Sequence, residues 1–115
     1  MMFDDGRPYA YDRDGSPITF EQWARLRWTD DEPDAWRTGY ERIALDHVGD
    51  VSVSTVWLGL DHGHGLTSAP LIFETMVFGG PFDEQCWRYA TEDEARAGHA
   101  NVVALVRLSA EHCTS

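Results

Sequence analysis

Hydrophobic and polar positions along the chain separate a short helix, a run of strands and a longer helix. Residues 19–28 have apolar residues at helical spacing and begin with the capping pair Thr19 and Gln22, which predicts a short helix there. Before it, residues 1–17 contain the turn sequence Asp12-Arg13-Asp14-Gly15. Asp-Gly is a strong turn signal, so this segment is predicted to be an extended arm or a hairpin.

From residue 40 to residue 90 the apolar period changes to two. Four strands are predicted, at residues 40–48, 51–60, 71–78 and 85–90, with Gly49-Asp50 as a tight turn between the first two. A second capping box, Thr91 with Glu94, starts a helix over 92–110. One apolar stripe runs along that helix: Ala95, His99, Val102, Val103, Val106 and Ala110.

These elements predict an α+β fold in a single domain, residues 1–115. We expect an antiparallel meander of three to four strands, with the short helix N-terminal to it and the long helix packed on the sheet. The simplest hairpin registers place Trp57 opposite both Arg42 and Glu74, and Glu74 opposite Tyr89. One face then collects the residues of a core: Ile43, Leu45, Val56, Leu58, Leu60, Leu71, Phe73 and Val77.

The other predicted face is rich in aromatic residues and also carries charges. It holds Tyr40, Arg42, Val53, Thr55, Trp57, Ile72, Glu74, Met76, Phe78, Trp87 and Tyr89. Aromatic residues together with Met and Arg are typical of interfaces. Three interpretations remain open: a second core layer under the helix of Trp23 and Trp28, a surface for a partner or a homodimer, and a small-molecule site. The candidate binding residues are Arg42, Trp57, Glu74, Met76, Trp87 and Tyr89.

The charge of the chain restricts its partners. Its 115 residues include 20 acids and 9 basic residues, all of them Arg, for a net charge of −11. Binding to a phosphate backbone requires clustered cations, so we expect no direct contact with nucleic acid. Acids can instead imitate nucleic acid, which leaves an acidic inhibitor of a nucleic-acid-binding protein as an alternative function.

Localisation is expected to be cytoplasmic. The two cysteines are too few for a disulfide framework, and the first residues, Met-Met-Phe-Asp-Asp-Gly, lack the basic flank and apolar stretch of a signal peptide. No apolar run approaches the roughly 18–20 residues that span a bilayer, so no membrane contact is expected.

The only cluster that resembles a set of metal ligands is Asp61-His62-Gly63-His64. With Glu74 nearby it would suit a small metal-dependent hydrolase, whereas a polar turn fixed by Asp61 explains the same residues. Asp61 and His62 are therefore loop candidates, and neither a metal nor a cofactor is assigned. His99 is interpreted as a hydrogen-bonded core residue, and Cys86 as inert on the core face. No nucleophile elbow is present, so the sequence favours a non-catalytic protein.

Four segments resemble a family of small uncharacterised proteins encoded by bacteriophages and prophages. They are VSTVWLGLDH at 53–62, PLIFETMVF at 70–78, YDRDGSPITFEQWA at 11–24 and YATEDEA at 89–95. The resemblance implies a phage gene product that acts in the host cytoplasm, and it supplies no activity. The family pattern has another residue, often an aromatic one, at position 64, which counts against a His-x-His metal site. Asp61, His62, Glu74 and Thr75 match the pattern.

The function expected from these observations is that of a phage-encoded accessory protein. We expect a non-catalytic module that binds a host or phage protein, with a homodimer as one arrangement of the same surface.

Overall fold

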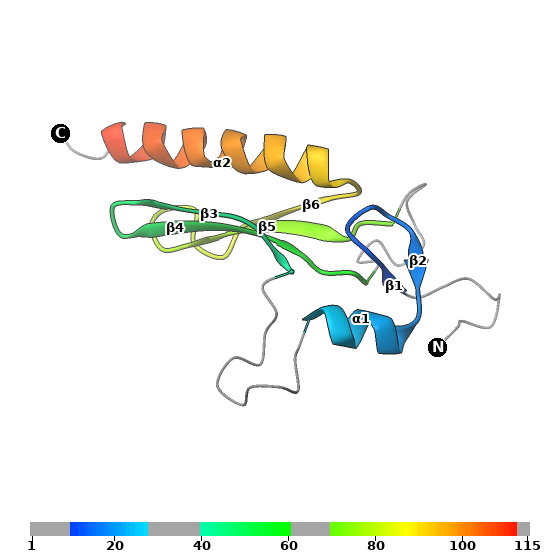
Figure 1. Ribbon diagram of the computed structural model, residues 1–115. Coiled ribbons are helices and arrows are strands. Elements are labelled where there is room, and N and C mark those ends of the chain that lie inside the picture. Colours follow the sequence, from blue (N-terminus) through cyan, green and yellow to red (C-terminus); the bar gives the residue numbers. More distant parts are fainter. Residues whose placement is uncertain (1–9, 28–39, 61–69, 113–115) are drawn as a thin grey trace, which may run out of the picture.

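A four-stranded antiparallel sheet covered by one long helix forms the centre of the structure (Figure 1). The computed structural model describes residues 10–27, 40–60 and 70–112. For residues 111 and 112 it describes the backbone only. In chain order the elements are β1 (Ala10–Tyr11), β2 (Pro17–Ile18), α1 (Phe20–Arg27), β3 (Arg42–Val48), β4 (Val51–Trp57), β5 (Phe73–Phe78), β6 (Cys86–Tyr89) and α2 (Glu92–His112).

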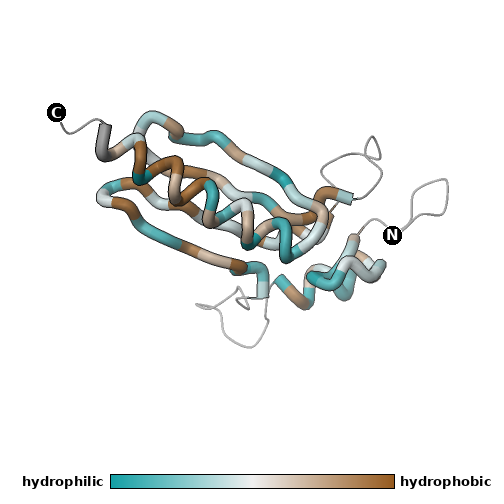
Figure 2. Tube along the Cα trace, turned by 90° about the horizontal axis from the view of Figure 1, so that it is seen from above, coloured by the Kyte–Doolittle hydropathy of each residue, from teal (hydrophilic) through white to brown (hydrophobic). Residues whose placement is uncertain are grey.

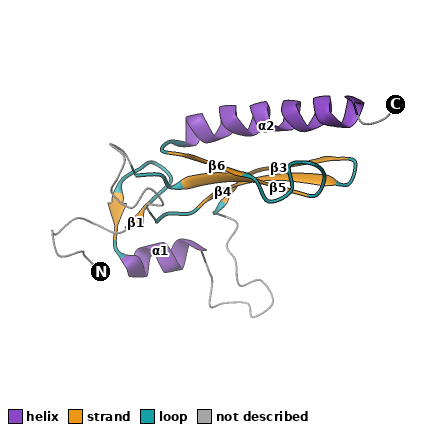
Figure 3. Cartoon of the chain, turned by 180° about the vertical axis from the view of Figure 1, so that it is seen from behind, coloured by secondary structure: helices purple, strands orange, loops and turns teal. Residues whose placement is uncertain are grey.

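The predicted α+β fold is confirmed. The strands β3, β4, β5 and β6 form the meander in that order, and β1 pairs with β2 in a small hairpin. The helix α2 lies on one face of the sheet, whereas α1 lies on the opposite side, at the end where the small hairpin packs (Figures 1 and 3). Among the described residues, no helix has the length and apolar character that a membrane span requires.

Both predicted capping boxes are present. The Thr19 hydroxyl accepts a hydrogen bond from the Gln22 backbone N–H at 3.1 Å, and the Gln22 side chain accepts one from the Thr19 N–H at 2.9 Å. At the start of α2, Thr91 and Glu94 make the same reciprocal pair. Each box satisfies donors that the first turn of a helix leaves without intrahelical partners.

Two clusters of buried apolar side chains hold the layers together. One lies under the C-terminal half of α2 and consists of Val53, Val77, Val102, Val103 and Val106. The other lies at the hairpin end and consists of Ala10, Trp23, Ile43, Trp57, Ile72, Phe73 and Ala95. Seen from the α2 side, the helix lies across the strands with an apolar stretch in its C-terminal half (Figure 2). The predicted stripe of α2 is buried as expected, except that Ala110 is exposed.

Gly98 lies within α2, where a glycine costs roughly 1 kcal/mol relative to alanine. A Cβ at this position would lie 2.3 Å from the ring of Tyr89, which packs against the helix. The glycine therefore allows α2 to approach β6 closely.

None of the three predicted residue pairs is present, and the register is shifted throughout in two of the three strand pairs. Trp57 and Tyr89 were both predicted opposite Glu74, and the structure pairs both of them with Phe73. The pairing of β3 with β4 follows the tight turn as far as Ala44, and a β-bulge then places Arg42 opposite Val56. Because side chains alternate with a period of two, a slip of one residue exchanges the two faces of a strand relative to its neighbour.

The predicted division of residues between the faces is therefore also wrong. The face under α2 carries Val53, Thr55, Trp57, Phe73, Thr75, Val77, Trp87 and Tyr89. Leu45, predicted to be in the core, is 40% exposed, and Trp57, predicted on the other face, is fully buried. Cys86, which was expected to be buried, is exposed. The predicted core residues Val56, Leu58, Leu60 and Leu71 are only partly buried.

Candidate functional site

The six predicted binding residues do not share a surface. Trp57, Trp87 and Tyr89 lie on the face under α2, whereas Arg42, Glu74 and Met76 lie on the opposite face. Loop candidates Asp61 and His62, together with His64, lie outside the described residues.

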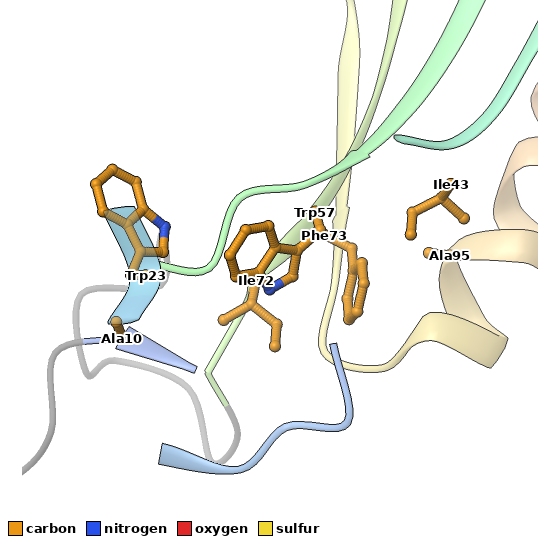
Figure 4. Close-up of a cluster of buried hydrophobic side chains, with 7 residues drawn as sticks. All are labelled: Ala10, Trp23, Ile43, Trp57, Ile72, Phe73 and Ala95. Atoms are coloured by element: carbon orange, nitrogen blue, oxygen red, sulfur yellow. The ribbon is translucent and has the colours of Figure 1, made fainter. Parts of the chain in front are cut away.

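Trp57 is a structural residue. Its indole Nε1 donates a hydrogen bond to the carbonyl of Tyr11 at 3.0 Å, and its ring meets that of Tyr40 edge-on at 4.8 Å. Figure 4 shows the indole between Trp23, Ile72 and Phe73. Gly59, with a φ of +80°, packs so closely against the rings of Trp23 and Trp57 that a side chain there would clash with both. Trp57, a binding residue predicted from the sequence, thus holds the hairpin and α1 against the sheet.

The face of the sheet turned away from α2 is the candidate binding surface, here named the open face. Three cross-strand rows compose it: Arg42, Val56, Glu74 and Arg88; Leu45, Ser54, Met76 and Cys86; and His47, Ser52 and Phe78. Leu45 is 40% exposed and Phe78 is 48% exposed. A sheet covered on one face ordinarily alternates apolar residues inward with polar residues outward. The open face departs from that pattern in its second and third rows.

Electrostatics on the open face are set by the first row. Arg88 Nε donates a hydrogen bond to Glu74 Oε2 at 3.0 Å, so Glu74 has the partner that its position between apolar neighbours requires. The partner comes from the adjacent strand β6, and Arg42 is not involved. Within the part of the chain that the structure describes, the Arg42 guanidinium makes no hydrogen bond and no ion pair.

A buried chain of polar side chains connects α2 to three strands. His99 Nε2 lies 2.7 Å from Asp46 Oδ2, and His99 Nδ1 lies 2.7 Å from Thr55 Oγ1. The Thr55 hydroxyl in turn lies 2.5 Å from that of Thr75. A carboxylate only accepts hydrogen bonds, so His99 Nε2 donates to Asp46, while Nδ1 and the Thr55 hydroxyl share the second bond of the ring. The interpretation of His99 as a hydrogen-bonded core residue is confirmed.

The order hydroxyl, imidazole, carboxylate is that of a catalytic triad. Thr55 and Thr75 are both fully buried, however, and His99 is 5% exposed. A substrate carbonyl cannot reach either hydroxyl in this arrangement. Of this polar chain, the sequence indicated His99 alone. Thr55 and Thr75 alternate with outward-facing residues along their strands, and this pattern could have indicated that both hydroxyls are buried.

A second polar cluster fixes the hairpin to the first turn of α2. Arg13 donates two hydrogen bonds to the Glu92 carboxylate, at 2.8 and 2.7 Å, and Arg96 adds a third at 3.0 Å. The bond from Arg13 lowers the pKa of Glu92 below its ordinary value. Arg13 also stacks on the ring of Tyr40 at 5.4 Å, and burial raises the pKa of that phenol.

No group of three His, Cys, Asp or Glu side chains within the described residues could hold a metal ion. Glu74, suggested above as a further ligand, is bound to Arg88. Glu41 is 4% exposed, and its Oε1 has no hydrogen-bond partner among the described residues. One buried carboxylate without neighbouring ligands is not a metal centre.

No protein-family model matches the chain, and no curated protein and no solved structure matches it. The candidate site therefore rests on its own geometry, and the resemblance to small phage-encoded proteins stays a prediction.

Proposed function

We propose that this chain is a non-catalytic protein-binding module and that the open face docks a host or phage protein. The observation that carries the proposal is the exposure of Leu45 and Phe78, 40% and 48%, on a face that no described element covers at this end of the sheet. Met76 adjoins Phe78 along β5, and Ser52 and Ser54 of β4 separate these two residues from Leu45. Exposed apolar groups bordered by polar residues are typical of protein interaction sites. The phage setting and the host cytoplasm rest on the four sequence segments that resemble phage proteins.

The proposal moves the binding surface away from the tryptophans. Replacing Trp57 would unfold the hairpin end of the core, so the loss of a partner in such a variant would report on folding. Leu45 and Phe78 are suitable test positions because both side chains are already substantially exposed.

A matched pair of leucine substitutions tests the surface. Leu45 lies on the open face at 40% exposure, and Leu108 lies on α2 at 53% exposure. We expect tagged chain to capture a partner from the lysate of the cell that makes it, Leu108→Asp to capture it equally well, and Leu45→Asp to lose it. Circular dichroism melts of both variants establish that the fold is retained. Equal capture by the two variants would place the partner elsewhere.

Salt separates this proposal from the alternative of an acidic inhibitor that imitates nucleic acid. An interface through Leu45 and Phe78 persists at high ionic strength, because burial of apolar area does not depend on screening. A complex that dissolves in high salt and is indifferent to Leu45→Asp would fit the acidic inhibitor instead.

A further inference from the structure

The first row of the open face is locally positive on a strongly acidic protein. It contains two guanidinium groups, those of Arg42 and Arg88, and one carboxylate, that of Glu74. Glu74 is largely shielded, with its side chain 13% exposed, whereas the side chain of Arg88 is 42% exposed. Arg42 is exposed and makes no ion pair with any described residue. A partner on this face therefore meets two positively charged hydrogen-bond donors, the guanidinium groups of Arg42 and Arg88.

Three described acids lie nearer to this row: Glu41, which precedes Arg42, is buried at 4% exposure, Glu21 is paired with Arg25 on α1, and Asp46 is bonded to His99 of α2. The other acids whose side chains are described, apart from Glu74, occupy the small hairpin, the turns that end the strands, and the first turn of α2: Asp12, Asp14, Asp50, Asp83, Glu84, Glu92, Asp93 and Glu94. At physiological ionic strength charges are screened beyond about 8 Å. Asp50 follows the far end of β3, about 25 Å from Arg42 at the usual rise of about 3.3 Å per residue. Local contacts with Arg42 and Arg88 therefore outweigh the net charge of −11 at this face.

The face opposite α2 is covered by a described helix at one end only. The helix α1 occupies that side only at the hairpin end, held by Trp23 Nε1, which donates to the carbonyl of Leu58 at 2.8 Å, and by Arg27, which donates to that of Trp57 at 3.0 Å (Figure 3). In an antiparallel sheet with helices on one face, the other face ordinarily carries polar residues. Beyond α1, the second and third rows offer Leu45, Met76 and Phe78 to an apolar helical stripe.

From this juxtaposition we infer that the open face accepts an amphipathic helix of a partner protein, with acidic side chains beside its apolar stripe. The apolar stripe contacts Leu45, Met76 and Phe78, and the acids pair with Arg42 and Arg88. The inference rests on the proposed function and specifies the chemistry of the partner.

A photo-cross-linking residue at the surface identifies what lies against it. Phe78→p-benzoylphenylalanine keeps an aromatic ring at an exposed position, and the same residue in place of Leu108 is the control on α2. We expect irradiation of the tagged protein in the cell that makes it to join position 78, and not position 108, to one protein. Mass spectrometry should place the joined segment in a sequence with apolar residues three and four apart and more acids than bases.

Charge reversal tests the role of the arginine row. Arg42→Glu and Arg107→Glu change the net charge equally, and Arg107 is exposed on α2. We expect Arg42→Glu to reduce cross-linking from position 78 about tenfold, and Arg107→Glu to leave it unchanged. Arg42→Gln, which removes the charge without reversing it, should give an intermediate loss.

The outcomes separate the inference from the proposed function. A joined segment that is basic, a second copy of this chain, or stronger cross-linking in Arg42→Glu would overturn the inference and leave the open face as a docking surface. No cross-link from position 78 would overturn the proposed function together with the inference.

Discussion

At the scale of single residues, Thr55 is the inner link of the polar chain under α2. Its hydroxyl bonds both the Thr75 hydroxyl and His99 Nδ1, and His99 Nε2 donates to Asp46 at the other end. Only the outer end, at Asp46, reaches solvent, with its side chain 50% exposed. Loss of the Thr55 hydroxyl, which links two other polar groups, therefore leaves more buried groups without partners than loss of the terminal Thr75 hydroxyl.

Two isosteric substitutions test the inner position of Thr55. Thr55→Val leaves His99 Nδ1 and the Thr75 hydroxyl without partners, and an unsatisfied buried polar group costs about 1–3 kcal/mol. Thr75→Val removes only the terminal hydroxyl, and we expect its cost to stay below about 1 kcal/mol. Urea denaturation at neutral pH measures both free energies of unfolding. Equal losses, or a larger loss for Thr75→Val, would contradict the inner position of Thr55 in the chain.

At the scale of elements, the Glu92 carboxylate joins the hairpin to α2. The two bonds from Arg13 to Glu92 connect residues 79 positions apart in the chain, and both side chains are about three-quarters buried. The attachment orients the hairpin over Trp57, because Arg13 also bonds the hydroxyl and the carbonyl of Tyr40.

The attachment should depend on pH in a known direction. The bond from Arg13 lowers the pKa of Glu92 in the folded state, relative to an ordinary value of 4.5. A lowered folded pKa means that its stabilisation is fully present above the unfolded value and is lost as the pH falls through the folded value. Glu92→Gln should therefore lower the free energy of unfolding by about 1–2 kcal/mol at pH 7.

Urea titrations of wild type and Glu92→Gln at several pH values measure this difference, which should shrink steadily below the ordinary glutamate pKa. Glu21→Gln is the control, because its ion pair with Arg25 is exposed and exposed pairs contribute little. A difference for Glu92→Gln that does not change with pH would refute the electrostatic account.

The elements themselves were predictable from sequence, and their register was not. Thr19, Gln22, Thr91 and Glu94 act through contacts three residues apart, which a sequence pattern shows directly. The register of β4 with β5 depends on a long connection, residues 58–72, whose geometry no short turn determines. Both strands also carry apolar residues at odd and even positions, so alternation does not decide which face is buried.

The error in the predicted register also affected the choice of candidate site residues. Glu74, Met76 and Arg42 were selected on a face they do occupy, but the aromatic residues selected with them came from the buried side. The structure adds Leu45 and Phe78 to the candidate surface because both are exposed. A slip of one residue in the predicted register of β4 with β5 was enough to place Leu45 on the core face. The β-bulge before Ala44 was likewise absent from the pattern, because one extra residue in a strand leaves no distinct composition.

At the scale of the whole molecule, stability is concentrated in the two central strands. Both buried apolar clusters are centred on β4 and β5, and each of these strands is paired on both sides. The strands β3 and β6 are the edges of the sheet. Edge strands present backbone donors and acceptors without strand partners, and such edges are a route to pairing with another chain.

Hydrogen exchange distinguishes docking on the open face from pairing along an edge. The pair Val48 and Val51 closes a two-residue hairpin, so its bonds alternate along β3: the amides of Ala44 and Asp46 point toward β4, and those of Leu45 and His47 point away. We expect the latter two to exchange much faster than Val53 and Thr55 in the purified protein. A partner bound to the open face through side chains leaves the Leu45 and His47 amides fast. A partner that adds a strand to β3 protects both of them and would contradict the proposed mode of docking.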